Sequence, residues 1–389
     1  MKAFFGKLKS FVKKEVVLSI AIVCTIITIF VVSFDEGFKE YVRNTPFLTL
    51  FTDYFEWKTL VALFSMLVVV AGLKNTNVFE LVSRKLIGLC HTRRAVIYTL
   101  VFGTFFFDMI VANDMSLITF LPLTYIVLHS TGNDKYLGIT FILQTIAANM
   151  GGMITPHGNP QNLYLYSFYG MSTAEFMQVL LPQCGMILVM LIIAGLFIKN
   201  DELVLINKDP LNVDKKRLTV YVVLFVFVIA AIFLRINLLY FITLGLVIVS
   251  VAIMDRKRFT EVDYALIATF CVFFMFSGNL SRITTIAGPI QNVVAKNTLV
   301  SGLISCQFIS NVPTAILLSK FTTDYSSLLV AVNIGSLGII ISSLASLITL
   351  KEYLKHQPEN FKKYMLTFTC VNTIFLVVSL IVTWIMSII

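Results

Sequence analysis

The stretch NMGGMITPHGNPQNL, residues 149–163, places glycines, prolines and amides inside a region that is otherwise apolar. Such residues interrupt a helix, and irregular backbone at membrane depth persists only where protein buries it or where it lines a cavity. A related pattern occupies residues 333–347: when its first residue is aligned with Asn149, Gly335 falls on Gly151. We therefore expect two discontinuous membrane helices, one in each half of the chain.

Each discontinuous helix is preceded by a second polar interruption. The first reads Ala-Asn-Asp around Asn113, and the second reads Ser-Asn-Val-Pro around Asn311. Aligning these two asparagines places Ser116 on Thr314. Paired interruptions in the two halves of a chain are typical of secondary transporters, whose site lies where the repeats meet. The order of the interruptions therefore predicts a transporter.

The composition is that of a membrane protein. Of 389 residues, 58% are hydrophobic and 13% are charged, whereas a soluble domain carries about 25% charged residues. The apolar runs are about 20 residues long, the length of a helix that crosses a bilayer. Lys and Arg in cytoplasmic loops explain the net charge of +9, so no nucleic-acid partner is expected. The six cysteines include no Cys-x-x-Cys pair and indicate neither a metal site nor a disulfide.

Charge placement predicts an all-α polytopic protein with about nine spans and two re-entrant hairpins. The basic N-terminus is expected inside and the C-terminus outside. Residues 1–58 form a span and an outer loop, 59–199 a first repeat, 200–258 a loop and two connecting spans, and 259–389 a second repeat. Like segments run in opposite directions in the two repeats, so the repeat is an inverted one.

Each repeat contains a hairpin and a discontinuous helix. They lie at 95–128 and 136–169 in the first repeat, and at 289–320 and 326–350 in the second. The region 95–128 also fits two complete spans, because its ends lie on one side in either case. Its polar centre favours a hairpin with a tip at mid-membrane, since a full outer loop needs no polar turn at that depth.

The interrupted helices expose backbone N–H groups at half-helix N-termini and carbonyl groups at half-helix C-termini. The N-termini attract anions, whereas free carbonyl groups suit cations. We therefore expect a small anion between the half-helices, although small and polar residues also serve helix packing. The candidate substrate-binding residues are Asn113, Asp114, Ser116, Gly158, Asn159, Pro160, Asn162, Ser310, Asn311, Thr314, Ser342 and Ser343.

Asp108 and Asp114 are acids inside these helices. A carboxylate at bilayer depth is costly unless it is protonated or paired, so such acids are functional candidates. We interpret Asp114 as a proton- or cation-coupling group, although a neutral Asp that caps the next half-helix also fits. Asp108 either assists it or faces the scaffold, and His157 is either titratable or a capping group. Lys and Arg are absent from the interrupted helices, which argues against a multiply charged anion.

These motifs resemble the ion-transporter superfamily, which includes divalent anion/sodium symporters, citrate transporters, arsenite/antimonite efflux permeases and NhaD-type sodium/proton antiporters. The likeness spans nearly the whole chain. The tip at Asn113 looks like the Ala-Asn-Asp tip of arsenite permeases, and that at Asn311 resembles the Ser-Asn-Thr tip of dicarboxylate symporters. Residues 155–162 are similar to the Pro-x-Gly-x-Pro-x-Asn stretch, and the nearest branch is that of the bacterial anion permeases.

The resemblance implies a scaffold domain and a transport domain that moves as an elevator, usually in a homodimer. In sodium symporters of this superfamily each tip and its facing broken helix hold one cation. Asp114 replaces a neutral residue of the symporter tip, and isoleucines at 339–341 replace a polar stretch of the second broken helix. The candidate coupling-ion residues are then Asp114, Asp108, Asn113, Gly151, Thr155, Asn311, Gly335 and Gly338.

The sequence therefore predicts a secondary active transporter of the bacterial inner membrane that moves a small carboxylate or oxyanion with Na⁺ or H⁺. A sodium/proton antiporter that uses Asp108 and Asp114 is one alternative, and an ion channel is another, since re-entrant loops also form filters. No Walker loop or catalytic grouping indicates an enzyme. Na⁺ or H⁺ is the only ion expected, with no other metal and no cofactor.

Overall fold

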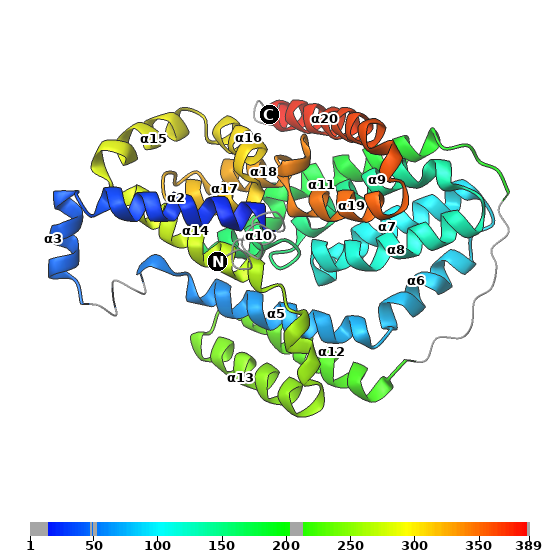
Figure 1. The fold of residues 1–389 in the computed structure, drawn as a ribbon, viewed down its shortest axis with the longest axis horizontal. Helices are drawn as coiled ribbons and strands as arrows, with labels where there is room; N and C mark the ends of the chain where they lie inside the picture. The colour runs from blue at the N-terminus through cyan, green and yellow to red at the C-terminus, as the bar shows by residue number, and fades with distance from the viewer. Residues whose placement is uncertain (1–14, 47–48, 50–52, 203–212, 387–389) are drawn as a thin grey trace, which may run out of the picture.

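The computed structural model describes residues 15–46, 49, 53–202 and 213–386, and this part of the chain is helical, without a β-strand (Figure 1). The helices of the first half are α2 (Val16–Val32), α3 (Glu36–Asn44), α5 (Trp57–Asn75), α6 (Val78–Gly88), α7 (Arg93–Val111), α8 (Asn113–Ser130), α9 (Leu137–Gly151), α10 (Pro160–Phe168) and α11 (Thr173–Leu196). Those of the second half are α12 (Lys215–Leu234), α13 (Asn237–Met254), α14 (Tyr264–Arg282), α15 (Thr284–Lys296), α16 (Thr298–Ile309), α17 (Asn311–Leu318), α18 (Tyr325–Ile334), α19 (Leu344–His356) and α20 (Phe361–Met386).

The predicted all-α polytopic class is confirmed. Eight helices of the described chain are long and apolar enough to cross a membrane, and α2 and α3 form a further pair bent by 89°. We count each hairpin as one re-entrant unit and each broken helix as one span. The described spans are then α2, α5, α9 with α10, α11, α12, α13, α14, α18 with α19, and α20, which agrees with the predicted number.

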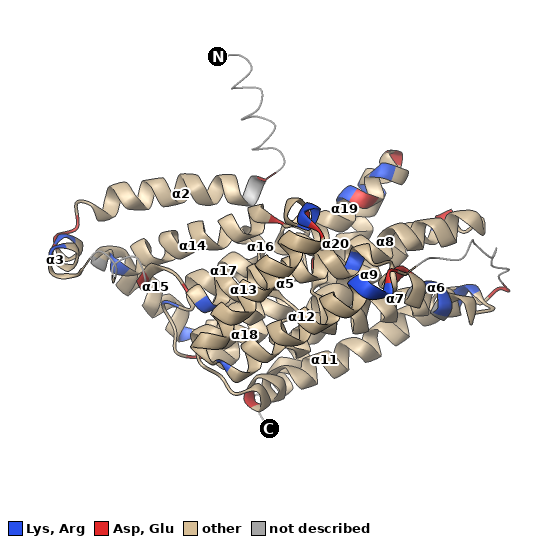
Figure 2. Ribbon diagram, turned by 90° about the horizontal axis from the view of Figure 1, so that it is seen from below, with Lys and Arg blue, Asp and Glu red and all other residues tan. Residues whose placement is uncertain are grey.

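Charged residues gather at opposite ends of the molecule, where Figure 2 shows α3 and α6. At the α6 end, Arg93 binds Asp201 at 2.8 Å and Arg217 binds Asp255 at 3.2 Å, which joins the ends of α7 and α11 and those of α12 and α13. We call this the basic end. The predicted inside and outside locations of the two termini rest partly on residues 1–14, 203–212 and 387–389. These residues lie outside the described chain.

We divide the packed helices into two groups. α5 lies beside α12 and α13, and α2 lies along α14 (Figure 1); we call these five the frame helices. Helices α7 to α11 and α16 to α20 pack mainly on one another, and we call them the hairpin group. The groups meet where α10 contacts α5 and where α17 contacts α14. The hairpin group holds all the residues predicted for the site.

The first hairpin consists of α7 and α8, which reverse at the single residue Ala112. Ala112 lies against Met66 and Leu67, in the middle of α5, rather than at either end of that span. The tip therefore lies level with the middle of α5, which favours a re-entrant hairpin over two complete spans. Its arms extend slightly beyond the predicted 95–128, because the Thr92 hydroxyl caps α7 by accepting from the N–H of Ala95 at 3.3 Å.

The second hairpin consists of α16 and α17, so the predicted start of the hairpin at Pro289 is wrong. Pro289 lies inside α15, which precedes the hairpin as a separate helix. The reason is a helix cap at Asn297, whose side-chain oxygen accepts from the N–H of Val300 at 2.9 Å and starts a new helix there. The broken helices are α9 with α10 and α18 with α19, and the second continues beyond the predicted residue 350 to His356.

Candidate functional site

The two hairpin tips have the same backbone geometry. Ala112 has φ 94° and ψ 146°, and Ser310 has φ 74° and ψ 160°. A positive φ is uncommon for a residue other than glycine. Asn113 and Asn311 follow these residues, and each side-chain oxygen accepts a hydrogen bond of 2.9 Å from the next backbone N–H. The alignment of these two asparagines in the sequence thus corresponds to a structural match.

The first tip folds onto the first broken helix. Asp108 Oδ2 accepts a hydrogen bond of 2.6 Å from the N–H of Gly152, and Thr155 Oγ1 donates to the carbonyl of Met109 at 2.9 Å. Only glycine fits at position 152, because the Cβ of any other residue would overlap the Asp108 carboxylate. Gly158 packs on the backbone of Gly152 in turn. The second oxygen of Asp108 is buried without a hydrogen-bond partner among the described residues.

The second tip is held by Gln307, which the sequence interpretation missed. Its amide donates to the carbonyls of Gly335 at 2.9 Å and Leu337 at 3.0 Å, and accepts from the N–H of Ile339 at 3.1 Å. Gly338 lies against the same amide with φ 107°, so a side chain there is strained and crowded. The available signal was position: Gln307 is a polar residue in the last turn before its tip, as is Asp108.

Two asparagines join the halves of the chain. Asn149 donates from Nδ2 to Ser343 Oγ at 3.0 Å, and Asn333 donates from Nδ2 to Asn162 Oδ1 at 2.7 Å. All four side chains are buried. Asn149 and Asn333 are the pair aligned in the sequence, and each reaches the start of the second half-helix of the other half. Neither was predicted as a site residue.

The starts of four half-helices meet at the centre of the hairpin group. They begin at Asn113, Pro160, Asn311 and Leu344, within a few residues of the predicted positions. α10 packs on α17, and α8 packs on α19. Ser310 Oγ donates to the carbonyl of Ser342, just before α19, at 3.3 Å. The partial positive charges of four N-termini therefore share one region, which suits an anion, although side-chain and backbone oxygens already accept from several of their N–H groups.

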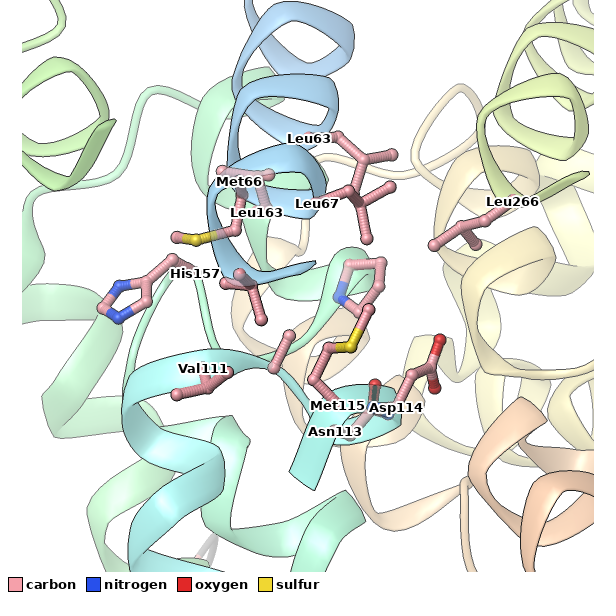
Figure 3. Close-up of a pocket in the computed structure, with 13 residues that line it drawn as sticks. Leu63, Met66, Leu67, Val111, Asn113, Asp114, Met115, His157, Leu163 and Leu266 are labelled. Carbon is pink, nitrogen blue, oxygen red and sulfur yellow. Dashed lines mark hydrogen bonds between the residues drawn. The ribbon is translucent and has the colours of Figure 1, made fainter. Parts of the chain in front are cut away.

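A cavity of about 20 Å³ lies at the first tip (Figure 3). Asn113, Asp114 and Pro160 line it together with Leu67 of α5 and Leu266 of α14. Asp114 Oδ1 is buried there without a hydrogen-bond partner in the described chain. A space of this size holds about one water molecule, so the cavity as it stands is too small for a carboxylate.

His157 lies away from Asp114 on the far side of this cavity in Figure 3. Its ring is edge-on to Phe225 and Phe233 of α12, with ring centroids 6.5 and 6.0 Å apart. The break in the first broken helix is therefore in direct contact with the frame helices. His157 is an interface residue between the two groups.

Three predicted substrate contacts are used inside the protein itself. Ser116 Oγ donates to the carbonyl of Thr104 at 3.0 Å, and Thr314 Oγ1 donates to the carbonyl of Ser310 at 2.8 Å. Asn159 donates to the carbonyl of Asn149 at 2.9 Å. These bonds stabilise the hairpins and the first break, and none of the three residues lines the cavity. The sequence does not reveal the direction of these side chains.

The polar atoms at the centre of the hairpin group that could bind a cation are mainly oxygen atoms. Among the described residues no three His, Cys, Asp or Glu side chains gather as a metal site. Carbonyls of unwound helices are the usual ligands for Na⁺ in transporters. Side-chain oxygens that are buried here without a hydrogen-bond partner belong to Asp108, Asp114, Asn149, Asn159, Gln161 and Asn333.

Gly151→Ala is expected to destabilise the protein. A Cβ at Gly151 would overlap the backbone carbonyl of Phe105 on α7, and such overpacking costs about 1–3 kcal/mol. Gly185→Ala on α11 is the matched control, because no atom outside its own helix lies within 4 Å of the added Cβ. Alanine is favoured over glycine in a helix by about 1 kcal/mol. Thermal unfolding in detergent should show a lower Tm for Gly151→Ala only; equal Tm values would contradict the close packing of α7 and α9.

The comparisons with known proteins agree with this architecture. The chain is 32% identical over 303 residues to an uncharacterized transporter of Methanocaldococcus jannaschii, a match that covers 76% of this chain and 81% of the relative. It is 25% identical over 301 residues to the inner membrane protein YbiR of Escherichia coli, covering 76% and 80%. The family described as citrate transporter matches residues 10–329. The resemblance to the ion-transporter superfamily is thereby confirmed, and the chain is a multi-pass membrane protein that belongs to the citrate transporter family.

Proposed function

We propose that this protein is a secondary active transporter that moves a small carboxylate or oxyanion, coupled to Na⁺ or H⁺. The observation that carries the proposal is the meeting of four half-helix N-termini between the two hairpin tips. The partial positive charge of these N-termini attracts an anion without an intramembrane Lys or Arg. Membership of a citrate transporter family supports the same class of solute.

The two halves of the chain form an inverted repeat in this proposal. α5, the first hairpin, α9 with α10, and α11 correspond to α14, the second hairpin, α18 with α19, and α20. The matching tip geometry at Ala112 and Ser310 supports the correspondence, as do the reciprocal bonds of Asn149 and Asn333. Inverted repeats of this kind give one arrangement open to each side of the membrane.

Asp114 is the proposed coupling group, with Asp108 as its neighbour in the same hairpin. An intramembrane carboxylate that lacks a basic partner is costly while ionised. Binding of Na⁺ or H⁺ beside Asp114 Oδ1 removes that cost and prepares the first tip for the anion. The carbonyls and amides around Gly152 and Asn149 offer further oxygen ligands for Na⁺.

The proposed movement is an elevator displacement of the hairpin group against the frame helices. The cavity at the first tip is too small for a carboxylate solute and is closed partly by Leu67 and Leu266 of the frame. Opening it requires separation of the two groups. The contact surfaces at His157 and at Phe274, whose ring lies 5.5 Å from that of Tyr164, are aromatic. The movement also has to break the hydrogen bond of 3.1 Å from Arg235, at the end of α12, to the carbonyl of Tyr166.

The proposed membrane and orientation of the protein rest on the position of its basic end. We propose the plasma membrane of a prokaryote, with the basic end in the cytoplasm and the C-terminus outside. The printed name of the Escherichia coli relative, an inner membrane protein, supports this location. The protein is proposed to work as a homodimer within the bilayer, as the superfamily resemblance implies.

Uptake into proteoliposomes tests the proposal. Labelled citrate, succinate and arsenite are supplied in turn under an imposed Na⁺ or H⁺ gradient. We expect one of them to accumulate above its external concentration with one of the two gradients. A solute that only equilibrates, together with single-channel currents, would instead identify a channel and overturn the proposal.

A sodium/proton antiporter is the second candidate, and two buried carboxylates in one hairpin, Asp108 and Asp114, favour it. An internal pH dye distinguishes the two functions. Sodium-dependent alkalinisation or acidification without accumulation of any anion would assign the antiporter. Anion accumulation with the pH change of a symporter would exclude it.

A further inference from the structure

A second and much larger cavity, of about 440 Å³, lies between the two groups at the basic end. Its polar rim carries Lys74 at the end of α5 and Lys351 and Lys355 on α19. All three lysines are exposed, and one comes from the frame helices while two come from the hairpin group. Both groups of helices therefore place positive charge around the same space.

The cavity has a surplus of positive charge. Glu352 is its only acidic lining residue among the described residues, and it is engaged by Lys355 at 2.5 Å and by His356 at 3.4 Å. Glu261 is the acid that attracts Lys74 electrostatically. It also forms an ion pair with Arg258 and accepts a hydrogen bond from Asn75. Lys351 has no acidic partner among the ion pairs of the described chain. Lys355 and Glu352 neutralise each other, so the three lysines and one carboxylate leave a formal net charge of +2, which attracts anions.

This cavity lies one helical turn further toward the basic end than the cavity at the first tip. Val70 and Asn113 line the small cavity, and Lys74 and Leu117 line the large one. Each pair is four residues apart on one helix, α5 or α8, which corresponds to a rise of about 6 Å. The two cavities are thus consecutive along the crevice between α5 and α8, with the larger at the basic end and the smaller beside Asp114.

The walls of the larger cavity favour charge recognition. Leu117 and Leu121 of α8 are buried, and Ile348 of α19 completes an apolar wall opposite the lysines. Electrostatic attraction is stronger beside such walls than in open water, because field lines are focused in a cleft of low dielectric. The predicted range of the second broken helix, 326–350, contains no Lys or Arg, but the helix continues through Lys351 and Lys355. These lysines balance the charge of a multiply charged solute at the larger cavity, before it reaches the tip.

We propose that the cavity between Lys74, Lys351 and Lys355 is a binding site for a small anion with two or three carboxylate groups. This inference rests on the proposed function: the bound anion is the transported solute, held at the basic end before or after it occupies the tip site. The lysines concentrate the solute and select for multiple negative charges. The tip site then takes one carboxylate at its helix N-termini.

Binding of citrate to the purified full-length protein in detergent tests this site, with acetate as the singly charged probe. Calorimetric titration is performed on the wild type and on Lys74→Gln, Lys351→Gln, Lys355→Gln and the triple variant. A lysine beside an anionic group contributes about 1 kcal/mol, so each single change should raise the Kd for citrate about fivefold. The triple variant should raise it by about a hundredfold, and acetate binding should stay undetectable. Lys362→Gln on α20 is the control, because it removes the same charge from an exposed residue that does not line the cavity.

The test separates this site from the proposed function. Loss of gradient-driven uptake in Asp114→Asn tests the proposed function, whereas the Kd for citrate of the lysine variants tests this site. Citrate binding that the triple variant retains, or no citrate binding by the wild type, would overturn the lysine site even if uptake of a solute is intact. Lysine-dependent binding of phosphatidylglycerol in place of citrate would also overturn it, because the cavity would then be a lipid site. Gel-filtration profiles show that each variant is folded.

Discussion

Asp114→Asn is expected to abolish gradient-driven accumulation, so that the solute only reaches its external concentration. Asp114 is the carboxylate at the first tip, and its Oδ1 atom is buried without a hydrogen-bond partner in the described chain. Asparagine keeps the size and helix-capping ability of the side chain but neither ionises nor gains charge. The driving ion then has no group whose charge state links it to the solute.

Exchange of labelled for unlabelled solute is the second readout for this variant. It requires movement of the loaded site but no net coupling, so Asp114→Asn should retain it. Asp214→Asn is the matched control: Asp214 is exposed and caps α12 through the N–H of Arg217, a role that asparagine fulfils equally well. Accumulation by Asp114→Asn at the wild-type level would remove Asp114 from the coupling mechanism.

Joining α10 to α12 by a reducible cross-link is expected to stop transport completely. Tyr166 of α10 and Phe233 of α12 belong to different helix groups, and their ring centroids lie 6.5 Å apart. If the hairpin group must move along the frame helices, a covalent bridge between these positions holds it in one arrangement. Transport should return when the bridge is reduced.

The experiment replaces the six native cysteines and introduces Tyr166→Cys and Phe233→Cys, followed by a bifunctional methanethiosulfonate reagent. The two single-cysteine variants receive the same reagent and should transport normally. The double variant should transport before the reagent is added. Undiminished transport by fully cross-linked protein would show that α10 and α12 do not separate, and would exclude the elevator movement.

The sequence predicted the parts of the fold that rest on helix interruption. The sequence pattern aligns Asn113 with Asn311, and in the structure these two residues occupy equivalent places after the two tips. Interrupted helices are visible in a sequence because Gly, Pro and Asn stand out against an apolar background. The helices α3, α6 and α15 were not predicted, since short helices beside the apolar spans carry no such contrast.

The direction of side chains was the main feature that the sequence did not reveal. Ser116 and Asn162 look alike as polar residues near a helix start, yet Ser116 bonds within its hairpin and Asn162 accepts from Asn333 in the other half. Gln307 was missed because one amide in an apolar helix is usually a packing residue. Lys74 and Lys351 were interpreted only as markers of topology, because their common cavity depends on how α5 and α19 meet.

Accumulation by the wild-type protein, followed by collapse of the driving gradient with an ionophore, tests the central claim most directly. Proteoliposomes are loaded with labelled citrate, or with the solute that the uptake experiment identifies, until a steady internal excess is reached. The account predicts that the excess is lost within minutes of adding the ionophore for the coupling ion, and that it is kept with an ionophore for an unrelated ion. Solute that never exceeds its external concentration under any gradient would contradict a secondary active transporter.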